Sequence, residues 1–438
     1  MSFPRYPDYK DSAVEWLGEV PAHWASVRYK NVFDEKSVAG TALPPGSISF
    51  GRVIFKDDEF LHEPTKASYQ EVLSGEFLIN PINLNYDLKS LRTALSEIDT
   101  CVSPAYIVLN ARVATDKNYL KYQLHVFDLF HMKTLGAGVR QTITFGDIGA
   151  CFTFLPPIPE QTKIAAFLDR ETAKIDELVA EQRRLMELLK EKRQAVISHA
   201  VTKGLNPDTT MKPSGIEWLG EVPEKWTVIQ IRQAAKLESG HTPSRQHPEY
   251  WENCTVPWIT LADVWQIRDA KAEYVFDTKE KVSELGLANS SARRLPKGTV
   301  ILSRTASVGF SGIMGTDMAT TQDFANWMCG PRLQPEFLLY VLRAMVGEFR
   351  RLMMGSTHNT IYMPDIKSLR FALPSLDQQI EIVEHVRAIT REFDALTAEA
   401  QRAIDLLQER RTALISAAVI GQIDVRALSQ TKAMGPAA

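Results

Sequence analysis

Leu155-Pro156-Pro157-Ile158-Pro159-Glu160-Gln161 opens the stretch of sequence that decides the fold, because a long helical pattern follows it as far as Lys203-Gly204. No proline interrupts the pattern after Pro159, and its apolar residues keep the three-and-four spacing that the buried seam of a coiled coil requires. The expected seam residues are Ile164, Leu168, Ile175, Leu178, Leu185, Leu189 and Val196. The stretch therefore predicts one spacer helix over residues 155–204.

The same helical pattern occurs a second time, 218 positions later. It begins at Leu373-Pro374-Ser375-Leu376-Asp377-Gln378-Gln379, where Ser375 and Gln378 have the spacing of a capping box. Its expected seam residues are Ile382, Val386, Ile389, Phe393, Leu396, Leu407 and Leu414. We expect a second spacer helix over residues 373–422, followed by a flexible tail over 423–438.

Each helix belongs to a larger repeated unit. Residues 12–21 return as residues 214–223 at an offset of 202, whereas Gln141-Thr142-Ile143 pairs with Asn359-Thr360-Ile361 at an offset of 218. The second unit has therefore gained 218 − 202 = 16 residues in its middle. The segment at 211–226 bridges the first helix to the second unit, so we expect the N-terminal segment to lie in the equivalent place beside the end of the second helix.

Short β-rich segments bounded by turn-forming residues, each set followed by one amphipathic helix, indicate a mixed α/β domain in each unit. The expected fold class is α/β (α+β), with two such domains separated by two long antiparallel coiled-coil-like helices in a pseudo-two-fold tandem repeat. The first domain with its N-terminal segment covers residues 1–154, and the bridge with the second domain covers residues 205–372.

Composition and charge limit the possible functions. The chain has 438 residues, of which 45 % are hydrophobic, and no run of 18 apolar residues that would predict a membrane span. The formal charge is −3, but residues 25–154 carry 13 − 14 = −1 and residues 227–372 carry 17 − 14 = +3. So small a basic excess predicts weak DNA binding by the isolated chain. The four cysteines are far apart in the sequence, which argues against a metal site or a disulfide framework.

The sequence lacks the common catalytic motifs. It has no phosphate-binding Gly-x-x-x-x-Gly-Lys-Ser/Thr loop, no Gly-x-Ser-x-Gly elbow and no His-Glu-x-x-His. Asn80-Pro81-Ile82-Asn83 only partly matches the Asn-Pro-Pro-aromatic motif of adenine methyltransferases, and a turn at a strand end explains it better. The sequence therefore offers no recognised catalytic motif.

Polar loop residues beside glycines are candidates for DNA contacts. Arginine can pair with guanine, and asparagine or glutamine with adenine, through two hydrogen bonds each. The candidates are Arg140, Gln141 and Thr142 in the first domain, and Ser239, His241, Thr242, Ser244, Arg245, Arg304, Thr321, Gln322, Thr357, His358 and Asn359 in the second. The alternative interpretation is that these residues only form turns.

Together, the paired Trp-Leu-Gly-Glu-Val-Pro segments at 16–21 and 218–223, the two helix openings and Gly240-His241-Thr242-Pro243-Ser244-Arg245 resemble the specificity subunit of type I restriction-modification enzymes. The resemblance implies that each domain is a target recognition domain that reads one half of a bipartite site in double-stranded DNA. It implies that the helices act as a spacer and dock methyltransferase (modification) subunits, two in number, with restriction (endonuclease and translocase) subunits joining through them.

The resemblance further implies a non-catalytic chain in a prokaryotic cytoplasm. No cofactor would bind to this chain, and S-adenosylmethionine and ATP with Mg²⁺ would bind to the partner subunits. The 16 additional residues of the second unit imply that the two halves read different sequences. The alternative function that the residues leave open is a coiled-coil scaffold, without DNA, whose domains bind protein.

Overall fold

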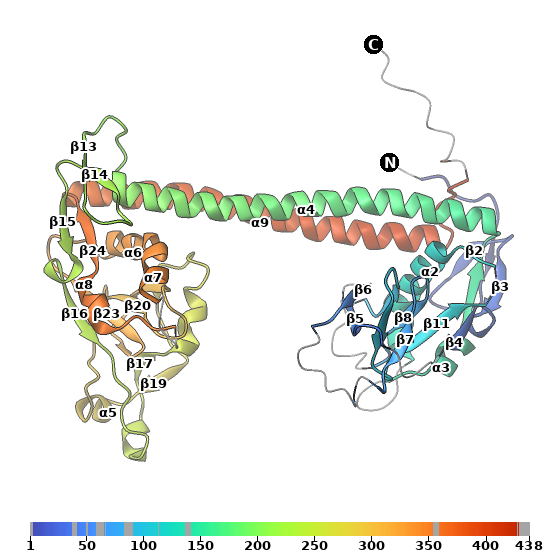
Figure 1. Cartoon of the computed structure of the whole chain (residues 1–438), viewed down its shortest axis with the longest axis horizontal. Coiled ribbons are helices and arrows are strands. Elements are labelled where there is room, and N and C mark those ends of the chain that lie inside the picture. Colours follow the sequence, from blue (N-terminus) through green and yellow to red (C-terminus); the bar gives the residue numbers. More distant parts are fainter. Residues whose placement is uncertain are drawn as a thin grey trace, which may run out of the picture. The chain divides into compact units, whose positions relative to one another are not determined.

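The computed structural model describes residues 3–36, 42–49, 51–57, 65, 67–82, 91–112, 114–135, 142–353, 359–426 and 428. The chain divides into two compact units, Met1–Glu181 with Ala403–Ala438, and Gln182–Arg402. Each unit contains one α/β domain and one part of each of two long helices, α4 (Ile158–Lys203) and α9 (Leu376–Val419) (Figure 1). No helix in the described part of the chain combines the length and hydropathy needed to cross a membrane.

The two long helices begin and end in equivalent ways. Each follows a short strand, β12 (Phe152–Leu155) or β24 (Arg370–Leu373), and each ends just before a glycine with positive φ, Gly204 or Gly421. A glycine in this conformation is a common helix stop. The helices therefore start three residues later than the expected 155 and 373, because the preceding residues pair with β3 (Ala25–Arg28) and β15 (Thr227–Gln230).

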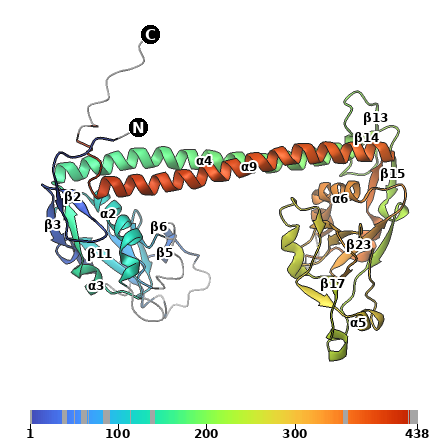
Figure 2. The same ribbon diagram turned by 180° about the vertical axis from the view of Figure 1, so that it is seen from behind.

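Within each unit the two helix segments run antiparallel and lie side by side (Figures 1 and 2). In unit 2, Arg193 of α4 contacts Thr390 and Asp394 of α9, while Val201 of α4 and Ile382 of α9 share one apolar core. In unit 1, Arg411 of α9 donates to Asp176 of α4 over 3.0 Å.

The buried stripe of each helix has the period of a straight α-helix. In α4 the buried or half-buried positions are Ile164, Leu168, Thr172, Ile175, Val179, Gln182, Met186, Leu189, Arg193, Ile197 and Ala200. Ten steps cover 200 − 164 = 36 residues, or 3.6 residues per step. In α9 the corresponding positions, each 218 later, are Ile382, Val386, Thr390, Phe393, Thr397, Ala400, Ile404, Leu407, Arg411, Ile415 and Ala418.

The expected seam was therefore wrong in part, because it assumed the 3.5-residue period of a supercoiled pair. Eight of its residues are buried, namely Ile164, Leu168, Ile175, Leu189, Ile382, Val386, Phe393 and Leu414. Leu178, Leu185 and Leu396 are exposed, and Val196, Ile389 and Leu407 are half-buried. The buried stripe is displaced by one residue from the expected seam, so that Val179 and not Leu178, and Thr397 and not Leu396, lie on the inner face.

The domain of unit 1 is built on a four-stranded antiparallel sheet in the order β4-β11-β8-β9. Its elements are β1 (Tyr9–Asp11), β2 (Glu19–Pro21), β3, η1 (Tyr29–Asn31), β4 (Phe33–Lys36), β5 (Gly46–Ser49), β6 (Arg52–Phe55), β7 (Gln70–Val72), β8 (Phe77–Ile79), β9 (Thr93–Leu95), β10 (Thr100–Val102), β11 (Ile107–Ala111), α2 (Lys117–Phe130), η2 (Met132–Thr134), α3 (Phe145–Ala150) and β12.

The domain of unit 2 has a five-stranded sheet in the order β16-β23-β20-β21-β18 and a three-stranded sheet β19-β17-β22. Its elements are β13 (Met211–Pro213), β14 (Glu221–Pro223), β15, η3 (Ile231–Gln233), β16 (Ala235–Ser239), η4 (Pro248–Trp251), β17 (Val256–Ile259), η5 (Leu261–Gln266), β18 (Tyr274–Val275), β19 (Glu280–Val282), α5 (Glu284–Ala288), β20 (Val300–Ser303), β21 (Ser311–Met314), β22 (Ala319–Thr320), β23 (Phe324–Cys329), α6 (Pro335–Ala344), α7 (Val346–Met353), α8 (Met363–Ser368) and β24.

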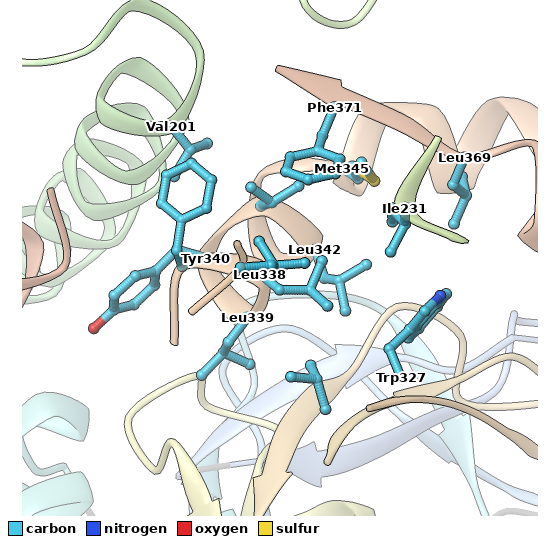
Figure 3. Packing of buried hydrophobic residues seen from close by; sticks show 14 of the residues in the cluster. Val201, Ile231, Trp327, Leu338, Leu339, Tyr340, Leu342, Met345, Leu369 and Phe371 are labelled. Atoms are coloured by element: carbon cyan, nitrogen blue, oxygen red, sulfur yellow. The ribbon is translucent and has the colours of Figure 1, made fainter. Parts of the chain in front are cut away.

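A single apolar core joins the second domain to the helices. Figure 3 shows side chains of α6, such as Leu338 and Leu342, packed among Val201 of α4, Phe371 of β24 and Trp327 of β23. Burial of these side chains drives the docking of the sheet, α6 and the long helices into one unit.

A buried glutamine joins each domain to its long helix. Gln161 accepts a hydrogen bond from the backbone N–H of Asp116 over 3.0 Å, and Gln379 accepts one from that of Gln334 over 2.9 Å. Asp116 and Gln334 are the N-caps of α2 and α6. The glutamine of the Glu160-Gln161 and Gln378-Gln379 motifs therefore fixes the domain helix against the start of the long helix.

The N-terminal hairpin β1-β2 and the bridge hairpin β13-β14 occupy equivalent places in their units, which confirms the expectation from the repeat. A Cβ on Gly421, just after α9, would lie 2.3 Å from Pro21. A Cβ on Gly204, just after α4, would lie 3.9 Å from the equivalent Pro223. The backbone N–H of Asp424 also donates to the carbonyl of Pro4 over 2.8 Å. The flexible tail expected over 423–438 was therefore wrong at its start, because Ile423 and Val425 are buried beside the N-terminal segment.

Candidate nucleic-acid interface

Four loops of unit 2 meet at one end of its five-stranded sheet. One loop follows β16, one follows β20, one precedes β23 and one precedes α8. The sheet order brings three of them together, because Ser239 at the end of β16 pairs with Ala325 of β23, and Ser303 at the end of β20 pairs with Phe324. The fourth is attached by a hydrogen bond of 2.9 Å from the N–H of Ile361 to the carbonyl of Arg304. We call this group the β16-end loops.

The β16-end loops bring together seven of the residues predicted from the sequence. The N–H of His241 donates to Thr320 over 3.0 Å, and the hydroxyl of Thr242 donates to Gln322 over 2.8 Å. The Nε of Arg304 donates to the carbonyl of Gln322 over 3.0 Å. The seven residues that lie in these loops are Ser239, His241, Thr242, Arg304, Thr321, Gln322 and Asn359.

Part of the group holds the loops in place. Arg304 donates to the carbonyls of Gln322 and Ile361, and the carboxylate of Asp323 accepts hydrogen bonds from Thr305 and the buried Thr321. A Cβ on Gly240 would lie 2.2 Å from both the carbonyl and the hydroxyl oxygen of Thr320, so only glycine fits where the two loops cross.

The other part of the group faces solvent. Ser239, His241, Gln322 and Asn359 are exposed, and Asn359 has a φ of 44°, a left-handed conformation that asparagine tolerates better than most residues. Their side chains supply both hydrogen-bond donors and acceptors. The site thus combines a hydrogen-bonded frame with exposed polar side chains that can donate and accept hydrogen bonds.

Two predicted residues make their contacts elsewhere. The guanidinium of Arg245 donates to Glu280 over 3.2 Å and lies 4.7 Å from the ring centroid of Trp251. The carbonyl of Ser244 accepts a hydrogen bond from the same tryptophan over 3.2 Å. Ser244 and Arg245 therefore belong to a structured loop supported by η4 and β19.

In the first domain, the loop that precedes α3 is attached in the same way as the loop that precedes α8 in unit 2. The N–H of Ile143 donates to the carbonyl of Pro81, just after β8, as Ile361 does to Arg304 just after β20. Thr142 is exposed and precedes the buried Ile143. Arg140, Gln141, Thr357 and His358 lie outside the described residues.

The exposed ring of Tyr362 is one feature that the sequence reasoning missed. Tyr362 follows the buried Ile361 and is 56 % exposed at the N-cap of α8. An aromatic ring at the edge of a polar loop cluster can pack on a sugar or a base. The signal was available in the sequence Thr360-Ile361-Tyr362, where an aromatic residue directly follows the candidate loop.

In the ranges that the structure covers, no three His, Cys, Asp or Glu side chains come together as a metal site.

Comparison with known proteins gives one family. The family model described as "Type I restriction modification DNA specificity domain" matches residues 223–405. The chain is 21 % identical over 425 residues to the type I restriction enzyme MjaVIII specificity subunit of Methanocaldococcus jannaschii, covering 94 % of this chain and 95 % of that protein. It is 26 % identical over 195 residues to the MjaIX specificity subunit of the same organism, covering 44 % of this chain and 43 % of that protein.

A solved structure has the same fold. It is described as "Structural basis underlying complex assembly and conformational transition of the type I R-M system", and one of its chains matches with a TM-score of 0.66 and 16 % identity. The match covers 92 % of this chain and 99 % of that chain.

Proposed function

Because the chain belongs to the type I restriction-modification specificity subunits, we propose that it recognises a bipartite site in double-stranded DNA, with one half read by each domain. DNA target recognition is implied by the family, and the division into half-sites rests on the repeat. The long helices dock methyltransferase and restriction subunits, and S-adenosylmethionine and ATP with Mg²⁺ bind to those partners.

The β16-end loops are the observation that carries this proposal. His241, Gln322 and Asn359 come from three separate segments and share one exposed surface on a frame held by Arg304 and Asp323. Histidine, glutamine and asparagine can each bond base edges, and glutamine and asparagine suit adenine. We therefore assign base recognition to the exposed members and loop support to Arg304 and Thr321.

Paired exposed leucines support two equivalent docking surfaces on the helices. Leu178 of α4 and Leu396 of α9 are each 44 % exposed and stand 396 − 178 = 218 positions apart. Leu188 and Leu406 show the same offset, 406 − 188 = 218, and are 51 % and 65 % exposed. Exposed apolar side chains mark protein interaction sites when they gather into a patch, and a surface repeated on both helices would suit two copies of one partner.

Reconstitution tests the proposal directly. The purified chain, a cognate methyltransferase subunit and their mixture are each incubated with DNA and S-adenosylmethionine, and modified adenines are mapped by long-read sequencing. We expect sequence-specific methylation only in the mixture. Methylation by the chain alone would contradict the non-catalytic role, and a mixture that methylates without sequence preference would favour a scaffold whose domains bind protein.

A domain exchange tests the division into half-sites. Replacing residues 25–154 with the matching domain of a relative should change one half of the mapped target and leave the other half unchanged. The reciprocal control replaces residues 227–372 and should change the other half. A change in both halves from either exchange would contradict one domain per half-site.

A further inference from the structure

Unit 2 contains a cavity of about 300 Å³ between its two helix segments, α6 and the segment that precedes β18. Seven charged side chains line it. Five are cationic, namely Arg193, Lys271, Arg343, Arg387 and Arg391, and two are acidic, namely Glu273 and Asp394. The lining therefore carries 5 − 2 = +3, and +2 when Glu336, which pairs with Arg387 over 3.4 Å, is included.

Arg343 is a buried cation whose hydrogen bonds go to neutral groups. It is 7 % exposed and donates to the carbonyls of Ala270 over 2.8 Å and Ala272 over 2.5 Å. No described carboxylate lies within 4.0 Å of its guanidinium nitrogens. Burial lowers the pKa of Arg343, which reflects the free-energy cost of holding this charge away from water. An anion in the cavity would offset that cost.

Two other cations of the cavity lining, Lys271 and Arg391, remain available to bind a ligand. By contrast, Arg387 forms an ion pair with Glu273 at 2.6 Å, and Arg193 is paired with Asp394. The side chains of Lys271 and Arg391 are exposed and make no hydrogen bond or ion pair with any other described residue. They can therefore close on a ligand without breaking an existing contact.

Unit 1 lacks three of these cations at the equivalent positions. At the equivalent positions, 218 residues earlier, Arg343 is replaced by His125, Arg387 by Asp169 and Arg391 by Ala173. There the hydroxyl of Tyr122 donates to Asp169 over 2.7 Å, and Lys121 pairs with Asp169 over 3.4 Å. The equivalent helices of unit 1 thus pack without cations at these positions, but the described sheet of unit 1, β4-β11-β8-β9, has no strand that corresponds to β18. Arg343 supports the segment before β18 through its two carbonyl contacts, whereas the exposed Lys271 and Arg391 have no such contact.

We propose that this cavity binds a small polyphosphate anion. A volume of about 300 Å³ is at the lower end of ligand pockets, which suits a compact anion better than an extended ligand. Arginine and lysine together are the usual ligands of phosphate groups, arginine through paired N–H donors and lysine as a point charge. The site would bind inorganic polyphosphate or the polyphosphate group of a nucleotide, and it is separate from the β16-end loops that we assign to DNA.

Calorimetric titration of the full-length chain with inorganic triphosphate, at low ionic strength and without Mg²⁺, tests the site. We expect saturable binding with one site per chain. ATP titrated in the same way distinguishes the two sources, since equal affinity means that the polyphosphate alone is recognised and tighter binding means that the nucleoside also contacts the protein.

The variant is K271Q with R391Q, and the matched control is R350Q with R402Q, two exposed arginines of the same unit that do not line the cavity. Both double variants remove two exposed cations, so both should fold. We expect the first to weaken triphosphate binding by at least about tenfold and the control by less than about twofold.

Three outcomes would overturn the proposal. They are no saturable binding up to about 10 mM triphosphate, equal weakening by both double variants, and displacement of triphosphate by non-specific duplex DNA, which would assign these cations to the DNA backbone. None of the three bears on whether the assembled complex recognises a bipartite target, so the two proposals fail independently.

Discussion

Arg411 of α9 donates to Asp176 of α4 over 3.0 Å, and the same pair recurs in the other unit with the helices exchanged, as Arg193 of α4 with Asp394 of α9. The offsets are 394 − 176 = 218 and 411 − 193 = 218. One duplicated helix therefore contributes the acid in one unit and the arginine in the other. A single sequence pattern, repeated once, supplies two cross-helix ion pairs.

The two ion pairs should differ in strength. The side chain of Arg193 is 14 % exposed and also donates to the carbonyl of Thr390, whereas the side chain of Asp176 is 47 % exposed. We expect R193A to lower the free energy of unfolding of unit 2 by about 1 to 3 kcal/mol, and R411A that of unit 1 by less than about 1 kcal/mol. Urea unfolding followed by limited proteolysis measures each unit, and equal effects would contradict the ranking.

Acidification should destabilise unit 1 through His125. Burial lowers the pKa of His125 to about 4, from an ordinary value of 6.5. The unfolded chain therefore takes up a proton near pH 6.5 that the folded chain does not accept until about pH 4, so stability is lost as the pH falls through this range, by up to about 3 kcal/mol.

The measurement is the difference in pH dependence between the wild-type chain and H125L, from urea unfolding at about pH 7.5, 6 and 5. Asp128 acts in the opposite sense, because burial raises its pKa to about 6 and its protonation stabilises the fold on acidification. Comparing the two chains cancels the contribution of Asp128. Parallel pH curves would show that His125 does not titrate in this way.

Alanine should be tolerated less well at Gly421 than at Gly204. Both glycines have positive φ, 81° and 76°, which costs any other residue about 1 to 2 kcal/mol. At Gly421 the added Cβ would also lie 2.3 Å from Pro21, against 3.3 Å from Trp226 at Gly204. We expect G421A to shift the thermal midpoint of its unit further than G204A. Gly18, which has a φ of 62° and no described atom within 4 Å of the place a Cβ would take, serves as the backbone-only control through G18A.

Substitutions among the β16-end loops should separate by role. In the assembled complex, Q322A should reduce discrimination at one base pair by about 1 to 3 kcal/mol, because the side chain of Gln322 is exposed at the surface of these loops. D323A should weaken binding to every half-site sequence and lower stability, since Thr305 and Thr321 lose their acceptor. Binding to a panel of single-base-pair variants distinguishes the two patterns, and uniform weakening by Q322A would remove it from base recognition.

The long helices could be predicted from the sequence because their period extends over more than about ten turns and their ends carry glycine signals. The phase of the buried stripe could not be predicted. A period of about 3.5 residues per step places Leu178 on the inner face and a period of about 3.6 places Val179 there, and both residues are apolar. Sequence spacing alone does not choose between them.

The polar residue types of the β16-end loops could likewise be predicted from the sequence, but the proximity of these loops in the fold could not. His241, Arg304, Gln322 and Asn359 are up to 359 − 241 = 118 residues apart. The strand order β16-β23-β20 brings the first three to one end of the sheet, and the hydrogen bond from Ile361 to Arg304 attaches the loop of Asn359. Arg304 illustrates the limit. Its residue type suggests a guanine contact, yet its donors are used by the carbonyls of Gln322 and Ile361.

The opposite charges of Asp169 and Arg387 at equivalent helix positions have a genetic consequence. Repeats within one gene can exchange sequence, and such an exchange could copy the helix at 117–130 over the start of the second domain's helix at 335–344. Lys121, which pairs with Asp169 in unit 1, would then stand in place of the buried Leu339, in a unit that has Arg387 where unit 1 has Asp169. A recombinant of this kind would set like charges together in its second unit. The charge difference between the two halves would therefore make such a recombinant less stable than the present second unit.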